Sequence, residues 1–213
     1  MTQTVKLQYL FDPLCGWCYG ASGTIKSLAK HPSIDLQPMA TGLFSGTGAR
    51  PMSGFAAQAW ANDQRIAALS GQVFSEDYRR DVLGDKDASL DSTVTTLAVT
   101  AVNETTPDRT IDALAALQAA RYVDGKDVTS ATVVATILSN MGLANAGARV
   151  VAADDSLLQA ASARMSAARD LMSTFGLQGV PAMIATIDGA QSVLDASALY
   201  AGTDDILAAL KRA

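Results

Sequence analysis

The two cysteines of this 213-residue chain, Cys15 and Cys18, lie within the run DPLCGWCYG. The residues before them, 4–11, alternate between apolar and polar and end on two apolar side chains, which predicts a β-strand entering a core. The residues after them, up to 30, have apolar side chains at helical spacing until Pro32. Two thiols at the start of such a helix can form a disulfide, and the first lies where unpaired backbone N–H groups stabilise a thiolate. The spacing therefore predicts a redox-active dithiol.

Further strands are predicted on both sides of a long helical segment. Residues 34–40 predict a second strand, which completes a parallel β-α-β unit with a right-handed crossover. Near the C-terminus, residues 182–187 and 190–194 flank Asp188-Gly189, a pair typical of a tight hairpin turn. A final helix follows this hairpin, and Thr203 is expected to be its N-cap.

The middle of the chain, residues 43–176, shows helical periods broken by capping signals and no strand of useful length. We therefore expect an α/β core formed by residues 1–42 and 177–213, with 43–176 inserted as an all-helical subdomain. The helices predicted in this insertion cover 55–69, 92–103, a segment that starts at Thr106 and Pro107, 133–141 and 157–172.

Composition narrows the classes of partner and the compartment. With 49% hydrophobic and 17% charged residues, the chain can bury a sizeable core. The net charge of -5, with no basic cluster longer than Arg79-Arg80, argues against nucleic acid or an anionic membrane as a partner. The sequence shows neither a signal-peptide pattern nor a segment long enough to span a membrane. We therefore expect a cytoplasmic protein, or a periplasmic one if a leader was removed.

Three other interpretations of the cysteines compete with the redox dithiol: a structural disulfide, a metal site and a chance spacing. A structural disulfide between such close residues constrains the unfolded chain little. A zinc site needs four ligands, whereas the chain offers two cysteines and one histidine, His31, at the far end of the first predicted helix. We therefore expect no metal site within one chain. A metal ion bound between two chains is the form of this alternative that remains open.

The whole pattern resembles the DsbA-like branch of the thioredoxin superfamily. It consists of a strand, the motif Cys15-Gly16-Trp17-Cys18, a helix, a second strand, a helical insertion, and a hairpin with a final helix. The match covers nearly the whole chain, and the motif from Asp12 to Gly20 is similar to that of a group of bacterial protein-disulfide isomerases. The resemblance implies a thioredoxin fold with a large helical insertion. It also implies thiol-disulfide exchange with protein or peptide substrates, no tightly bound cofactor, and glutathione or a thioredoxin-type protein as a redox partner.

The position of each thiol predicts its role. Cys15 lies at the helix N-terminus, where the attacking thiolate is stabilised, and Cys18 lies one turn inside as the resolving thiol. Gly16 and Trp17 between them bring no cationic side chain, unlike the Pro-His pair of strongly oxidising DsbA enzymes. The sequence therefore leaves the direction of electron flow open.

In the family a cis-proline faces the dithiol, and Pro181 in Gly179-Val180-Pro181 has the matching position. The resemblance implies that a cis bond turns the Val180 backbone toward the thiols, where it can pair with an extended substrate peptide. An ordinary proline at the first residue of a strand is the other interpretation. Trp17 is expected to pack on the substrate, to cover the helix start, or both.

Two other function classes fit parts of the pattern. The related kappa-class glutathione transferases and chromene-carboxylate isomerases share the inserted architecture and bind glutathione. They typically have a serine where Cys15 stands and need no resolving thiol, so Cys18 counts against this alternative. A holdase or an intersubunit metal-binding module is the non-enzymatic alternative.

Overall fold

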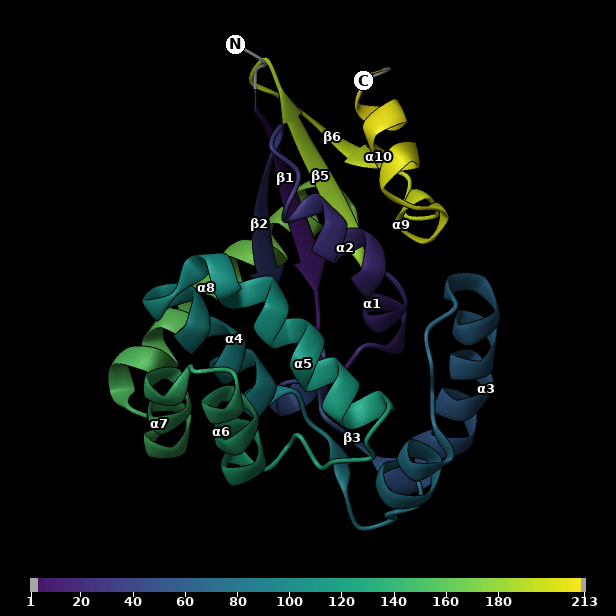
Figure 1. Ribbon diagram of the computed structural model, residues 1–213, viewed down its shortest axis with the longest axis vertical. Helices are drawn as coiled ribbons and strands as arrows, with labels where there is room; N and C mark the ends of the chain where they lie inside the picture. The colour runs from purple at the N-terminus through teal and green to yellow at the C-terminus, as the bar shows by residue number, and fades with distance from the viewer. Residues whose placement is uncertain (1–3, 212–213) are drawn as a thin grey trace.

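The computed structural model describes residues 4–211, and a four-stranded sheet lies at its centre in the order β2-β1-β5-β6 (Figure 1). Strand β1 (Val5–Phe11) runs parallel to β2 (Ile34–Ala40) and antiparallel to β5 (Ala182–Ile187). Strand β6 (Ala190–Leu194) pairs with β5 as a hairpin. The predicted β-α-β and β-β-α units thus join through β1 and β5 into one mixed sheet, as in a thioredoxin fold.

Both faces of the sheet are covered by helices because successive side chains of β1 point to opposite sides. A buried cluster on one face contains Leu10 of β1 and Ala168 of α8 (Asp155–Thr174). Tyr9 belongs to the larger core on the other face, together with Ile25 of α2 (Ser22–Leu28) and Ile206 of α10 (Thr203–Leu210).

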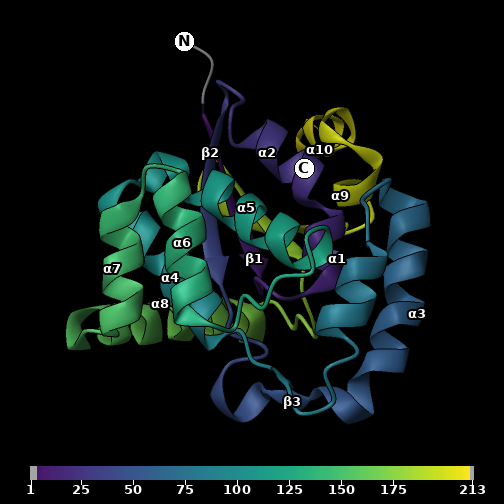
Figure 2. The same ribbon diagram turned by 60° about the horizontal axis from the view of Figure 1, so that its bottom comes forward.

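Helices dominate the segment between β2 and β5. Helix α3 (Met52–Ser70) lies on one side of α1 (Gly16–Gly20), and the other helices of the segment gather on the opposite side (Figures 1 and 2). Among residues 4–211, no helix has both the length and the apolar content that a membrane crossing requires. The remaining helical elements are the 3-10 turn Gly46–Gly48, the π-helix Tyr78–Val82, α4 (Thr93–Thr105), the 3-10 turn Pro107–Arg109, α5 (Thr110–Tyr122), α6 (Ala131–Asn140), α7 (Ala144–Ala152) and, after β6, α9 (Ala198–Ala201).

Several element boundaries differ from the sequence prediction. The single helix expected up to residue 30 is two helices, α1 and α2, which meet at Ala21, where ψ is -8°. Gly20 and Gly23 flank this point, and glycine weakens a helix interior. Thr203 is not an N-cap, because α10 already includes it and Gly202 precedes the helix.

Four elements of the middle segment were not predicted as they occur. Helix α7 is rich in alanine and its buried face consists of Ala146, Gly147 and Val150, so large apolar residues give it little periodic signal. The short strands β3 (Arg50–Pro51) and β4 (Ser89–Leu90) pair with each other, although no useful strand was expected there. The helix expected from Thr106 begins with a 3-10 turn and becomes α-helical at Thr110.

Candidate active site

Cys15 and Cys18 lie together at the start of α1 but differ in access. Cys15 is the N-cap residue, with extended backbone angles, and its carbonyl accepts a 3.0 Å hydrogen bond from the Tyr19 N–H. Both cysteines are free thiols, and 7% of Cys15 but only 1% of Cys18 is exposed. Burial raises the pKa of the Cys18 thiol well above its usual range, and the neighbouring Cys15 adds to this shift. Cys18 is thus the less exposed of the pair, and its thiol holds its proton strongly.

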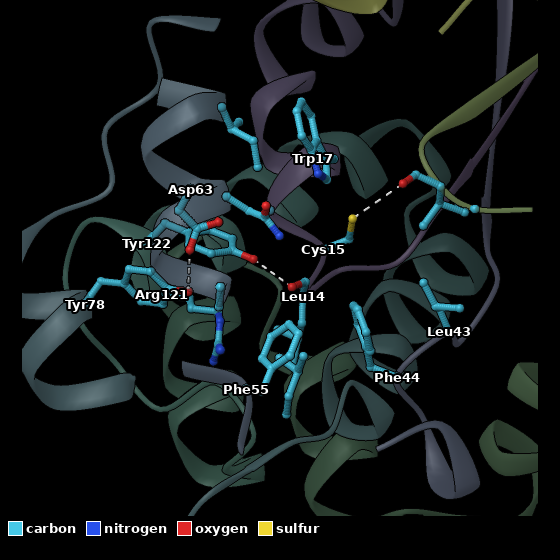
Figure 3. Close-up of a pocket in the computed structure, with 17 residues that line it drawn as sticks. Leu14, Cys15, Trp17, Leu43, Phe44, Phe55, Asp63, Tyr78, Arg121 and Tyr122 are labelled. Atoms are coloured by element: carbon cyan, nitrogen blue, oxygen red, sulfur yellow. Dashed lines mark hydrogen bonds between the residues drawn. The ribbon is translucent and has the colours of Figure 1, made fainter. Parts of the chain in front are cut away.

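The Val180-Pro181 segment faces Cys15 from the other side of the site. The peptide bond between Val180 and Pro181 is cis, as the family resemblance implied. The Sγ of Cys15 lies 3.6 Å from the Val180 carbonyl oxygen (Figure 3). Pro181 is buried directly before β5, while Val180 is half-buried and keeps part of its surface open. The structure therefore brings Cys15 and Val180, 165 positions apart, into one site.

Asp12 holds the loop that leads into Cys15. Its carboxylate is fully buried and accepts hydrogen bonds from the backbone N–H groups of Leu14 and Phe44, at 2.9 and 3.0 Å. The Ser92 hydroxyl donates a third hydrogen bond to it at 2.7 Å. Burial raises the pKa of Asp12, and these hydrogen bonds oppose that shift. Asp12 therefore stabilises the turn at Pro13 and Leu14, and its bonds to Phe44 and Ser92 connect the end of β1 to the middle segment.

A cavity of about 240 Å³ opens next to Cys15, and it is lined by residues of both the thioredoxin-like core and the middle segment. Its walls include Trp17, Val180, Phe44 and Phe55, so they are mainly apolar. The half-buried Trp17 packs edge-on against Tyr200 at 5.7 Å, and the Tyr200 hydroxyl donates to the Trp17 carbonyl. Trp17 therefore both covers the helix start and lines the cavity.

Polar side chains from the middle segment form one wall of this cavity, and the sequence analysis missed them. Asp63 on α3 accepts a 3.0 Å hydrogen bond from the Tyr78 hydroxyl. Arg121, near the end of α5, lies against the rings of Tyr78 and Tyr122 (Figure 3). Burial raises the pKa of Asp63 to about 6, although Tyr78 and the Arg121 charge both lower it. Arg121, at the end of a largely apolar helical stretch, was the available signal, but the sequence could not show that it reaches the cavity at Cys15.

The close approach of α3 to the start of α1 leaves no room for a side chain at Gly16. A Cβ atom at this position would lie 2.5 Å from the Asp63 Oδ1, far inside contact distance. A glycine between the cysteines thus lets a buried carboxylate come next to the first turn of α1. This steric role of Gly16 in supporting the motif could not be read from its sequence neighbours.

Other aromatic and sulfur-containing residues around the site fall into two groups. Phe55 lines the cavity, whereas Met52 is 1% exposed and belongs to the core. Tyr19, next to Cys18, is buried, stacks on Tyr122 at 4.6 Å and donates to the Val73 carbonyl, so it packs internally. Among residues 4–211, no group of three or more His, Cys, Asp or Glu side chains could hold a metal ion.

Comparison with solved structures identifies proteins of the same architecture. The cytosolic disulfide reductase DsbM from Pseudomonas aeruginosa is 31% identical, with 97% of each chain covered and a TM-score of 0.87. A structure of the same protein with GSH matches with a TM-score of 0.81 over 97% of this chain and 98% of that one. No family model matches the sequence, and no curated protein matches it.

Two more distant structures share the fold. A candidate protein disulfide isomerase from Nitrosomonas europaea is 19% identical, with 99% of this chain and 97% of that chain covered and a TM-score of 0.79. A 2-hydroxychromene-2-carboxylate isomerase is 14% identical, with coverages of 97% and 96% and a TM-score of 0.63. At these identities the likeness concerns the fold alone.

Proposed function

The chain belongs to the DsbA- and DsbM-like family of thioredoxin-fold thiol-disulfide oxidoreductases, and from this premise we propose that Cys15 and Cys18 are its redox-active pair. The observation that carries the proposal is the contrast between the two thiols. Cys15 lines an open cavity and lies 3.6 Å from the Val180 carbonyl, whereas Cys18 is 1% exposed behind it. Cys15 therefore attacks the substrate, and Cys18 resolves the intermediate.

The reaction proceeds by two exchanges. The Cys15 thiolate attacks one sulfur of a substrate disulfide, so a mixed disulfide forms while the other substrate sulfur leaves as a thiolate. Cys18, after losing its proton, attacks the Cys15 sulfur and releases the second substrate sulfur. The substrate gains two electrons and two protons and becomes two thiols. The Cys15-Cys18 pair loses the same number of each and becomes a disulfide.

We propose the reductase direction, with glutathione as the electron donor. The 31% identical DsbM is described as a cytosolic disulfide reductase, and one of its structures contains GSH. One glutathione thiolate attacks the oxidised pair at Cys15, the accessible sulfur, and frees Cys18. A second glutathione attacks the sulfur of the first, which gives glutathione disulfide and restores both protein thiols. A cytoplasmic location fits this cycle, because glutathione keeps that compartment reducing.

The substrates proposed here are disulfides of proteins or peptides. The Val180 backbone beside Cys15 offers hydrogen-bonding groups to an extended chain, and Trp17 offers an aromatic surface on the same cavity. Pro181 holds Val180 in this place. Val180 and Trp17 are thus assigned to substrate binding.

The test measures glutathione-dependent reduction of a disulfide-bonded peptide by the wild-type chain and by two matched variants. Cys15→Ser is expected to abolish turnover and to form no adduct. Cys18→Ser is expected to accumulate a mixed disulfide, seen as a mass gain of one peptide half or one glutathione. Undiminished turnover of Cys15→Ser would overturn the assignment. Conjugation of glutathione to an electrophile that survives loss of Cys18 would favour a transferase instead.

A further inference from the structure

Arg121 is a buried cation that the exchange chemistry leaves unused. It is 2% exposed, and it nevertheless lines the cavity that holds Cys15. Its Nε has no hydrogen-bond partner among residues 4–211. Its Cζ lies 5.5 Å from the Tyr78 ring centre and 5.7 Å from that of Tyr122. Because a buried charge is costly unless it is paired, this guanidinium is expected to have an anionic partner that enters the cavity.

Asp63, whose carboxylate lines the same cavity, is not the anionic partner of Arg121. Its Oδ2 accepts the hydrogen bond of the Tyr78 hydroxyl at 3.0 Å, and its Oδ1 lies toward Gly16. The Arg121 charge lowers the pKa of Asp63, but none of the ion pairs within 4 Å among residues 4–211 joins the two side chains. The cavity thus contains a guanidinium whose Nε has no partner among residues 4–211, beside a carboxylate that already accepts a hydrogen bond from Tyr78.

We infer that Arg121 binds a carboxylate of the thiol substrate that exchanges with Cys15. This inference rests on the proposed function and names its substrate class, a small thiol that carries a carboxylate. A guanidinium matches a carboxylate with two parallel hydrogen bonds. The apolar walls at Phe44 and Phe55 exclude water and strengthen such a pair. In Figure 3 the Arg121 guanidinium points toward Phe55 within this cavity.

Glutathione has two carboxylates, one on its glycine and one on its γ-glutamyl residue, and either can supply the group. The experiment uses the two monoamides of glutathione, each of which neutralises one carboxylate and keeps the thiol. KM and kcat for reduction of the disulfide-bonded peptide are measured with glutathione and with each monoamide as the electron donor. The wild-type chain is expected to show an increase of about tenfold in KM for one monoamide, with kcat little changed. The monoamide that is affected identifies the carboxylate.

The variant Arg121→Gln is expected to raise the KM for glutathione about tenfold and to remove the difference between glutathione and the affected monoamide. Arg79→Gln is the matched control, because Arg79 lies 5.0 Å from the Trp60 ring centre outside the cavity, and it is expected to keep the wild-type KM values. If Arg121→Gln does not fold, the wild-type series with the two monoamides still tests whether a carboxylate is bound, and Arg121→Lys, which keeps the positive charge, replaces Arg121→Gln in assigning the residue.

Two results would overturn the assignment of Arg121. One is equal KM values for glutathione and both monoamides in the wild-type chain. The other is a monoamide penalty that persists undiminished in Arg121→Gln, which would place the carboxylate at another residue. A different result would contradict the proposed function: glutathione and both monoamides fail to reduce the chain, whereas a dithiol reductant succeeds. Glutathione would then not be the electron donor, and the ligand proposed for Arg121 would be wrong as well.

Discussion

The hydroxyl of Tyr122 donates a 2.7 Å hydrogen bond to the backbone carbonyl of Leu14, the residue directly before Cys15 (Figure 3). Tyr122 ends helix α5, so this bond ties the helical segment to the loop that carries the first thiol. Tyr19, next to Cys18, stacks on the same ring. The start of α1 is therefore held from the helical side of the molecule as well as by its own sheet.

Replacement of Tyr122 by Phe should reduce the free energy of unfolding by about 1 to 3 kcal/mol, because a buried carbonyl loses its donor while the ring packing stays. Urea denaturation followed by circular dichroism gives this difference. Tyr19→Phe is the matched control, since its hydroxyl donates to the carbonyl of Val73, a residue 57% exposed, where water can replace it. Equal losses in the two variants would contradict a special role for the Tyr122 bond.

Gly16→Ala should destabilise the chain, because the new Cβ would lie 2.5 Å from the Asp63 Oδ1, so the Asp63 side chain, which accepts the Tyr78 hydrogen bond, or one of the helices α1 and α3 must shift. Such overpacking typically costs about 1 to 3 kcal/mol. Gly54→Ala on α3 is the control. A Cβ there meets no atom within 4 Å, so this variant should be as stable as the wild type or more stable by up to about 1 kcal/mol. A fully stable Gly16→Ala would show that α3 moves away easily.

The features that the sequence predicted are those encoded by neighbouring residues. The hairpin between β5 and β6 follows from Asp188-Gly189, whose φ angles of 51° and 82° suit these residue types. The placement of Cys15 and Cys18 follows from a strand that leads into a helix, since that junction occurs within one short stretch. These local patterns define the thioredoxin-like sheet and the dithiol.

The features that the sequence did not predict depend on contacts between distant parts of the chain. Asp63, Tyr78 and Arg121 reach the cavity from three separate elements, and no local spacing links them. Helix α7 was missed because small residues form its contact face, and a Cβ at Gly147 would come within 3.0 Å of the Ala135 carbonyl of α6. The residues of α7 that face α6 are small, so no large apolar side chains mark this contact in the sequence.

The two thiols should react at very different rates with iodoacetamide. Cys18 is 1% exposed and burial raises its pKa, so it is expected to stay protonated and unmodified at pH 7 to 8 while Cys15 is alkylated. Digestion under denaturing conditions and mass spectrometry locate the label, and a sample alkylated in urea gives the fully labelled reference. Label that appears first on Cys18 would reverse the roles of attacking and resolving thiol.

Asp63 should make the stability of the chain depend on pH. Its pKa in the folded chain is raised from 3.8 to about 6, so the folded state holds this proton more tightly than the unfolded state does. The stabilisation is therefore complete below pH 4 and is lost as pH rises through 6. A shift of this size corresponds to about 3 kcal/mol. Asp63→Asn removes the ionisation and keeps an oxygen that can accept the Tyr78 hydrogen bond.

The measurement compares urea denaturation of Asp63→Asn and the wild type between pH 4 and pH 7.5. The variant should gain stability relative to the wild type across this range, by up to about 3 kcal/mol, because only the wild type has to ionise a buried carboxyl. Asp170→Asn, on the exposed side of α8, should show no such trend. A pH-independent difference for Asp63→Asn would mean that Arg121 and Tyr78 together compensate fully for the burial of the Asp63 charge.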